Sequence, residues 1–290
     1  MRLQQNRYVR GNLWRGLWAE SRHIIQVVAA HAEMREGDAV ASYESSGVLY
    51  GIPLYRHVPD RVHMTLPTGG RSSSRAGLMR HREELPDQDR AERDGVPCTS
   101  LERTTFDAIR ALNREAAVAF ADAALRQVAW SEDGYDLGIG EAWRARMLER
   151  VGRLPGARGI RQAEEVIRFA DGRAELPGES VTRLQLGRLG FTRFGLQVPV
   201  PGPNGSDYRI DLDIEEVATF FEFDGQGKYL EESLRSGRSL DEVLLAEKRR
   251  EDWIRGVTQR RFVRVEDAHI GSAEALASRL AAFGIPIPGR

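Results

Sequence analysis

The chain has 290 residues and a mass of 32.5 kDa; 41% of its residues are hydrophobic and 29% are charged, with 42 Lys and Arg against 43 Asp and Glu. This balance is typical of folded globular domains and excludes a disordered tail. A net charge of -1 means that the protein has no overall positive potential that would attract nucleic acid. A single cysteine, Cys98, excludes an internal disulfide and a cysteine-based zinc cluster, and no apolar stretch predicts a membrane span, so we expect a cytoplasmic protein.

The first half of the chain predicts a mixed α+β domain. Apolar residues recur at helical spacing in four stretches, and two short stretches are candidate strands. The predicted elements are helices over 13–34, 42–50 and the two halves of 99–126, and strands over 61–66 and 76–81. The pattern weakens between 131 and 158, where glycines surround one short amphipathic piece. We place the domain boundary there, which gives domains 1–152 and 153–290.

The second half predicts an α/β domain, because helices and strands alternate along it. The predicted elements are helices over 159–171 and 177–189, strands over 193–200, 207–214 and 217–224, a helix over 240–255, a strand over 260–266 and a helix over 272–283. Ser239 and Glu242 form a capping box, which marks the start of the helix at 240. We therefore expect an α/β fold for the protein.

Four carboxylates follow one another on two neighbouring strands of this second domain. Period-two alternation predicts that Asp211 and Asp213 share one face of their strand, as do Glu222 and Asp224 on the next. Glu222 follows an apolar run, where a carboxylate is costly unless a cation compensates it. Oxygen ligands without His or Cys favour a hard ion, so the pattern predicts Mg²⁺ or Mn²⁺.

Glu179 lies in the first turn of the helix that begins at Pro177, and two interpretations of it stay open. It is either a structural cap, favoured there by the helix dipole, or a third metal ligand beside Asp211 and Glu222. A further alternative is that the strand carboxylates are only a solvated hairpin edge. We give this alternative less weight, because Glu222 alternates with phenylalanines.

A helical Glu, a strand Asp and the sequence Phe221-Glu-Phe-Asp-Gly225, followed by Lys, resemble the PD-(D/E)XK nuclease superfamily over residues 155–290, most of all its Vsr-type branch. The resemblance implies a restriction-endonuclease-like three-layer α/β/α domain with a mixed central sheet. It also implies that Glu179, Asp211 and Glu222 bind Mg²⁺ or Mn²⁺, which lowers the pKa of a water that hydrolyses a phosphodiester of nucleic acid, preferably DNA.

Lysine is rare in this chain, which makes its positions informative. The only lysines are Lys228 and Lys248, and lysine offers a compact charge with an adjustable pKa that arginine does not. Asp224 occupies the position, two residues after Glu222 in the candidate catalytic site, at which these nucleases normally have Lys. The resemblance therefore implies that Lys228 or Lys248 stabilises the developing negative charge. Asp224 also motivates a second hypothesis, a non-catalytic binding protein that retains the nuclease fold as a scaffold.

The helix over 240–255 carries a run of charges around Lys248. Arg249, Arg250 and Arg255 are candidate contacts to a phosphate backbone. The alternative is a solvated helix face on which acidic and basic side chains pair at i,i+4 spacing.

Residues 1–130 resemble the AbiEi-type antitoxins of type IV toxin–antitoxin systems. The phrases that carry the resemblance are Ser42-Tyr-Glu-Ser-Ser46, Leu49-Tyr-Gly-Ile-Pro-Leu54, Arg61-Val-His-Met-Thr65, Thr99-Ser-Leu-Glu-Arg-Thr104 with Asp107, and Asp122-Ala-Ala-Leu-Arg126. It implies an antitoxin or transcriptional regulator whose partner is a cognate toxin or operator DNA. The family usually begins with a winged helix, which we do not expect here, because the chain starts at residues that would follow it.

His63 and His81 lie on candidate strands of this antitoxin-like part. They do not predict a hydrolase, because the sequence has no G-x-S-x-G elbow and no paired His-Asp spacing. We interpret both as hydrogen-bonded structural groups.

Overall fold

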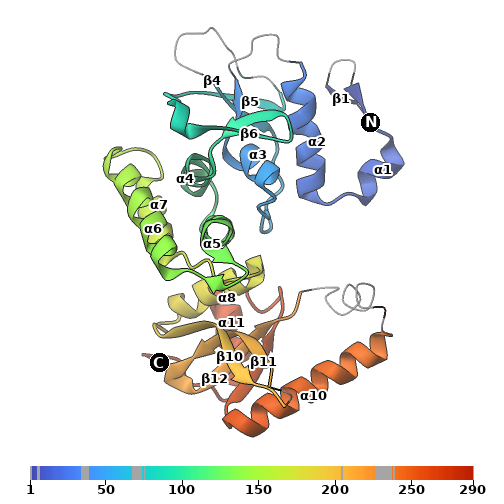
Figure 1. Cartoon of the computed structure of the whole chain (residues 1–290), viewed down its shortest axis with the longest axis vertical. Helices are drawn as coiled ribbons and strands as arrows, with labels where there is room; N and C mark the ends of the chain where they lie inside the picture. The colour runs from blue at the N-terminus through green and yellow to red at the C-terminus, as the bar shows by residue number, and fades with distance from the viewer. Residues whose placement is uncertain are drawn as a thin grey trace. The chain divides into compact units, whose positions relative to one another are not determined.

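The computed structural model describes residues 2–4, 7–33, 39–66, 74, 76–203, 205–225, 237 and 239–289. The chain forms two compact units, Met1–Gly172 and Arg173–Arg290, and each combines helices with a sheet of its own (Figure 1). The predicted α/β fold class is confirmed by this mixture of helices and mixed sheets. Among the described residues, no helix is both long and apolar enough to cross a membrane.

The first unit contains a five-stranded mixed sheet in the order β5-β4-β3-β7-β6. Its strands are β3 (Val40–Ala41), β4 (Val62–Leu66), β5 (Leu78–Arg82), β6 (Arg90–Arg93) and β7 (Val96–Thr99). The pairs β4–β5 and β3–β7 are parallel, and the pairs β3–β4 and β6–β7 are antiparallel. The strands expected over 61–66 and 76–81 are thus observed within two residues.

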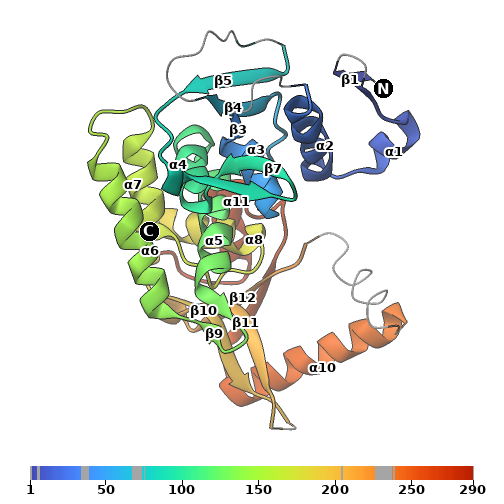
Figure 2. The same cartoon turned by 45° about the horizontal axis from the view of Figure 1, so that its top comes forward.

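Helices cover this sheet and extend the first unit. They are α1 (Gly11–Gly16), α2 (Ala19–His31), α3 (Tyr43–Gly47), α4 (Leu101–Ala111), α5 (Arg114–Ala129), α6 (Leu137–Gly152) and α7 (Ile160–Phe169). One-turn 3-10 helices lie at Val48–Tyr50 and Asp87–Asp89, and small hairpins pair β1 (Arg2–Gln4) with β2 (Arg7–Tyr8) and β8 (Trp130–Ser131) with β9 (Gly134–Tyr135). Figure 2 shows α6 and α7 running side by side.

The helix expected over 13–34 is two helices. The backbone is extended at Leu17 and Trp18, so α1 ends before α2 begins. The Arg22 guanidinium donates hydrogen bonds to the carbonyls of Trp14 and Arg15, each at 3.0 Å, and thereby satisfies carbonyls at the end of α1. By contrast, the break expected at Asn113 is observed, because its side chain caps α5 by accepting a hydrogen bond from the Ala116 N–H.

The first unit ends at Gly172, later than the boundary at 152 that the sequence predicts. Helix α7 belongs to the first unit because it packs on α4, α5 and α6. Gln162 in α7 donates hydrogen bonds of 2.8 Å to the carbonyls of Ile109 and Leu112, where α4 ends. These contacts join segments about 50 residues apart, which local composition does not predict.

The second unit has a four-stranded mixed sheet in the order β10-β11-β12-β13. Its elements are α8 (Pro177–Arg188), β10 (Phe194–Pro201), β11 (Asp207–Ile214), β12 (Thr219–Phe223), α10 (Leu240–Thr258), β13 (Arg261–Val265) and α11 (Ala273–Ala282), with a one-turn 3-10 helix at Glu215–Val217. Strands β10, β11 and β12 pair antiparallel, and β13 pairs parallel to β12. The sheet is therefore mixed, as the nuclease resemblance implies for this part of the chain.

Helices lie on both sides of this second sheet (Figure 1). On one side, Ile254 of α10 packs with Ile210, Phe220 and Phe262 of the strands. On the other side, α8 contacts α11, β11 and β12, and the Phe223 ring lies directly against Gly178. Phe220 and Phe223 point to opposite faces because successive strand residues alternate.

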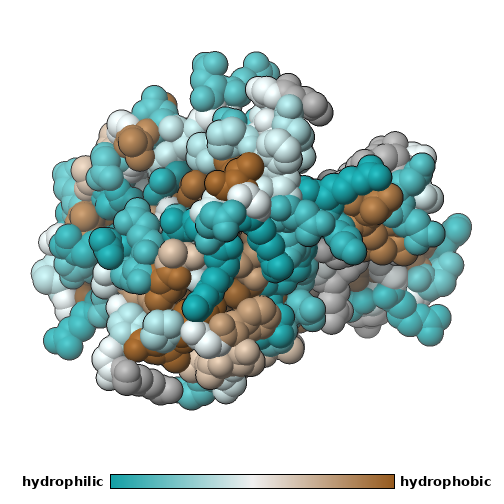
Figure 3. All heavy atoms as spheres, turned by 90° about the horizontal axis from the view of Figure 1, so that it is seen from below, coloured by the Kyte–Doolittle hydropathy of each residue, from teal (hydrophilic) through white to brown (hydrophobic). Residues whose placement is uncertain are grey.

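Figure 3 shows hydrophilic side chains over most of one face of the molecule, with separate apolar patches between them.

Candidate functional site

Glu179 and Asp211 come together in the second unit. Glu179 is 3% exposed, and its carboxylate accepts hydrogen bonds from the backbone N–H of Glu175 at 2.9 Å and of Leu176 at 3.2 Å. The Gln197 side-chain amide donates a further hydrogen bond of 3.3 Å. Burial, and then the charge of Asp211, raises the pKa of Glu179 to about 8. Glu179 therefore caps α8 and also faces a second carboxylate.

Asp211 holds two strands together beside this cap. Its Oδ2 atom accepts a hydrogen bond of 3.0 Å from the backbone N–H of Phe223, at the end of β12. Glu179 and Asp211, which we call the acidic pair, supply oxygen ligands of the kind that a hard cation prefers. Within the described ranges, however, no group of three or more Asp, Glu, His or Cys side chains is arranged to hold a metal ion.

Glu222 and Asp224 are each bound by an arginine. Glu222 is 1% exposed, and Arg250 of α10 binds its Oε1 atom at 2.5 Å. Arg264 lies opposite Glu222 in the register of β12 and β13, 3.6 Å from its Oε2 atom, and binds Asp224 at 2.8 Å. The cationic compensation that the sequence demands for a buried Glu222 is provided here by guanidinium groups. Asp213 likewise forms an ion pair with Arg260.

The other predicted cations lie mostly on α10. Lys248 and Arg249 are exposed on its surface. Arg255 forms an i,i+4 ion pair of 2.6 Å with Glu251, which is the contact expected of a solvated helix face. Lys228 lies outside the described residues, so its predicted catalytic role stays a prediction.

The antitoxin-like phrases of the first unit meet in a buried polar cluster. His63 Nδ1 lies 2.9 Å from His81 Nε2, and His23 Nε2 lies 2.8 Å from the Ser45 hydroxyl. Ser45 also accepts a hydrogen bond of 2.8 Å from the backbone N–H of His63, while Glu44 lies 3.5 Å from His63 Nε2. Burial lowers the pKa of His23 and His63, and lowers that of His81 to about 4. His63 and His81, which the sequence predicts to be hydrogen-bonded, are hydrogen-bonded to one another.

A second network surrounds Arg103, which lies in the antitoxin-like phrase Thr99-Ser-Leu-Glu-Arg-Thr104. Arg103 binds Asp107 at 2.7 Å, forms an ion pair with Glu83, and lies 3.4 Å from Asp89. Arg150 of α6 binds both oxygens of Asp89, at 2.8 and 2.6 Å. The available signal was the i,i+4 spacing of Arg103 and Asp107, which places the two opposite charges on one face of a helix. In the second unit, the equivalent signal was Arg264, which stands between two valines of a strand.

Comparisons with known proteins assign a family to the first unit. Residues 43–155 match the family described as "AbiEi antitoxin C-terminal domain". Two Mycobacterium tuberculosis proteins are similar over more of the chain, "Uncharacterized protein MT2308" of strain CDC 1551 / Oshkosh and "Uncharacterized protein Rv2248" of strain ATCC 25618 / H37Rv. Each is 31% identical over 201 residues, which cover 69% of this chain and 68% of the relative. The matched domain contains most of the polar cluster and the Arg103 network.

Proposed function

The chain belongs to the family of these mycobacterial proteins and carries an AbiEi antitoxin C-terminal domain, and we propose that it is a toxin–antitoxin regulator that acts by binding rather than by hydrolysis. In this proposal its partners are a cognate toxin and operator DNA. The second unit is a nuclease-like scaffold that contributes to binding.

The observation that carries the proposal is the 2.5 Å ion pair between Arg250 and Glu222. A PD-(D/E)XK-type nuclease needs its motif acid to hold a metal ion. Here Arg250 holds one oxygen of that acid, and Arg264 lies near the other. Removing a guanidinium from a buried carboxylate is costly, so the ion pair opposes metal binding at Glu222.

The exposed cations of α10 supply the nucleic-acid contact in this proposal. Lys248 and Arg249 project from the helix surface, where a phosphate backbone can reach both. Arg250 and Arg255 have carboxylate partners and contribute less to such a surface.

Fluorescence anisotropy with a duplex taken from upstream of the chain's own gene, and a scrambled duplex as reference, tests the proposal. The Asp211→Asn variant, which leaves the Arg250–Glu222 ion pair intact, is expected to bind both duplexes as the wild type does. Lys248→Ala/Arg249→Ala is expected to weaken binding and to lower its salt dependence by about 2 in logarithmic slope. Arg168→Ala, an exposed arginine of α7, is the control. Mg²⁺-dependent cleavage of either duplex, lost in Asp211→Asn, would overturn the proposal.

The second candidate function is Mg²⁺- or Mn²⁺-dependent nuclease activity, and the acidic pair favours it. The buried Glu179 carboxylate and the half-buried Asp211 carboxylate repel one another, and a divalent cation bound by both relieves that repulsion. Such a cation supplies an activated water for phosphodiester hydrolysis. In this second candidate function, Lys228 or Lys248 stabilises the negative charge that develops during phosphodiester hydrolysis. If the protein is a nuclease, Asp211→Ala abolishes metal-dependent cleavage and leaves the circular dichroism spectrum unchanged. Absence of both cleavage and metal binding in the wild type would refute the nuclease function.

A further inference from the structure

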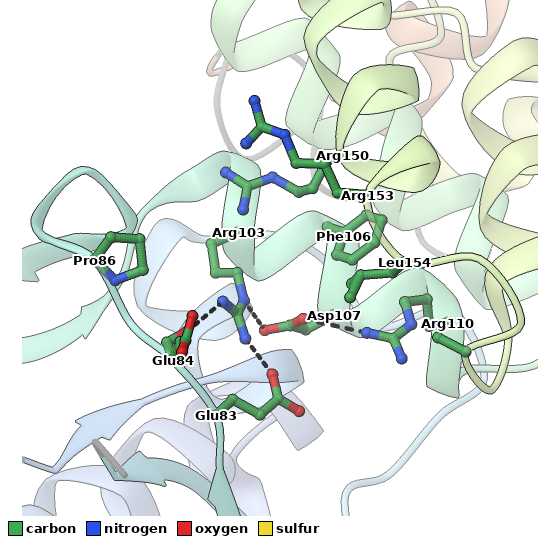
Figure 4. Close-up of a pocket in the computed structure, with 11 residues that line it drawn as sticks. Glu83, Glu84, Pro86, Arg103, Phe106, Asp107, Arg110, Arg150, Arg153 and Leu154 are labelled. Carbon is green, nitrogen blue, oxygen red and sulfur yellow. Dashed lines mark hydrogen bonds and ion pairs between the residues drawn. The ribbon is translucent and has the colours of Figure 1, made fainter.

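A pocket of about 460 Å³ opens in the first unit, between α4, α6 and the segment that follows β5 (Figure 4). Its volume lies in the range of small-molecule sites. The residues that carry the argument are Phe106, Asp107, Arg110, Arg153 and Leu154. The pocket lies within one compact unit and is separate from the acidic pair.

The pocket contains a hydrogen-bond acceptor and a donor that do not satisfy one another. Asp107 is fully buried, and its Oδ2 atom binds Arg103 at 2.7 Å. Its Oδ1 atom has no hydrogen-bond partner among the described residues and lies 3.9 Å from the Arg110 NH1 atom, too far for a hydrogen bond. The Arg110 Nε atom donates to the Arg158 carbonyl at 3.1 Å, which fixes the guanidinium in place.

This arrangement favours a ligand that carries a donor and an acceptor side by side. A buried acceptor without a partner is unfavourable, and a ligand N–H that donates to Asp107 removes that cost. Burial raises the pKa of Asp107 to about 7, so such a donor also stabilises the charged carboxylate. The Watson–Crick edge of a nucleobase offers this pairing of donor and acceptor.

The walls of the pocket suit a flat ring with an anionic substituent. Phe106 and Leu154 line it with apolar surface, and the Arg110 guanidinium lies over the Phe106 ring, 5.2 Å from its centre. Phe106 itself is 2% exposed, so the surface on which a base can stack is the guanidinium plane of Arg110. At the rim, Arg153 is 61% exposed and its partner is Glu149 at i,i+4, a surface pair of small energy that a phosphate can replace.

We propose that this pocket binds a mononucleotide unit, whose base edge bridges Asp107 and Arg110 and whose phosphate contacts Arg153. The unit is either a free mononucleotide or an unpaired nucleotide of a single strand, since both present the same chemistry. This inference is independent of the proposed regulatory function, because it uses neither α10 nor the acidic pair.

Isothermal calorimetry on the full chain tests it with AMP, CMP, GMP, UMP, ribose 5-phosphate and single-stranded tetranucleotides as probes. At least one mononucleotide or tetranucleotide is expected to bind saturably, about tenfold or more tightly than ribose 5-phosphate, which lacks the base. Tighter binding of a tetranucleotide identifies a nucleic-acid strand as the source of the unit, and tighter binding of a mononucleotide identifies the free species. No saturable binding of any probe up to about 1 mM overturns the proposal.

Three variants separate the pocket from general charge effects. Arg110→Gln removes the donor and is expected to weaken binding about tenfold, as for loss of a charge-assisted hydrogen bond. Arg153→Ala is expected to weaken it about fivefold. Arg168→Ala is the matched control, because Arg168 is 62% exposed and pairs at i,i+4 with Glu164, and it is expected to change the affinity less than about twofold. Wild-type affinity in folded Arg110→Gln, or ribose 5-phosphate binding as tightly as every mononucleotide, contradicts the proposal.

Discussion

Arg250 of α10 and Glu222 of β12 form a buried ion pair, with 2.5 Å between guanidinium and carboxylate. The same NH2 group also contacts the carbonyl of Arg209 in β11, so one side chain links the helix to two strands. The glutamate is 1% exposed, which makes the pair costly to break from either side. The position of α10 on the sheet therefore depends on this contact as well as on the packing of Ile254.

Replacing Arg250 by alanine is expected to destabilise the second unit by about 3–5 kcal/mol, because it leaves Glu222 buried beside one more distant arginine. Arg249→Ala, an exposed neighbour on the same helix, is expected to change stability by less than about 0.5 kcal/mol. Urea unfolding followed by circular dichroism gives both values. The double variant Arg250→Leu/Glu222→Leu should recover most of the loss; if it stays as unstable as the single variant, the charge argument fails.

Gly178→Ala is expected to destabilise the second unit by about 1–3 kcal/mol. An added Cβ atom at Gly178 runs into the ring of Phe223, so either the ring or α8 must move. Gly256→Ala is the matched control, because Gly256 is also helical and has open space at the corresponding position. This control should gain about 0.5–1 kcal/mol from helix propensity. Equal effects of the two substitutions in thermal unfolding would contradict the packing of α8 on β12.

The histidine cluster predicts acid sensitivity of the first unit. Burial lowers the pKa of His23, His63 and His81 below the usual 6.5, and that of His81 to about 4. Between pH 4 and pH 6.5, the histidines of the unfolded chain bind more protons than those of the folded chain. The free energy of unfolding therefore falls as the pH drops from about 6.5 to about 4.

Unfolding free energies of His81→Gln between pH 4 and pH 7 check this prediction. The variant is expected to show a shallower dependence on pH than the wild type. If the unfolding free energy of His81→Gln depends on pH as steeply as that of the wild type, His81 does not contribute to the acid sensitivity.

Glu179 predicts the opposite dependence on pH in the second unit. Its pKa is raised from 4.5 to about 8, so the folded chain binds more protons than the unfolded chain across this range. The stability associated with Glu179 is present below about pH 4.5 and is lost as pH rises to about 8. Glu179→Gln is expected to remove this loss while the amide retains an oxygen for the helix cap. Unfolding measured at pH 5 and pH 8 in both proteins should show a smaller difference for the variant.

The elements predicted correctly from the sequence are those specified by local patterns. Alternation in Asp207–Ile214, the capping box at Ser239 and the proline that begins α8 each act within a few residues. Strands β3 and β6 escaped prediction because the first has two residues and the second, Arg90–Arg93, has no apolar alternation. Their pairing with β7 stabilises them, and that pairing is not a local property.

The burial of Glu222 was predictable from the sequence, but its partners were not. The run before Glu222 correctly indicated a buried carboxylate that needs a cation. The identity of the cation depends on the register of β13, which places Arg264 opposite Glu222, and on the position of α10, which places Arg250 above it. Both are long-range relationships. Likewise, Glu179 was open between a cap and a ligand, and its hydrogen bonds to Glu175 and Leu176 establish the cap.

The proposal of binding without hydrolysis is tested most directly by titrating Mn²⁺ into the wild type and Asp211→Ala by isothermal calorimetry. The arginine partners of Glu222 and Asp224 predict no saturable Mn²⁺ binding in either protein. Saturable binding in the wild type that vanishes in Asp211→Ala would contradict this account and make the metal-dependent nuclease the primary function.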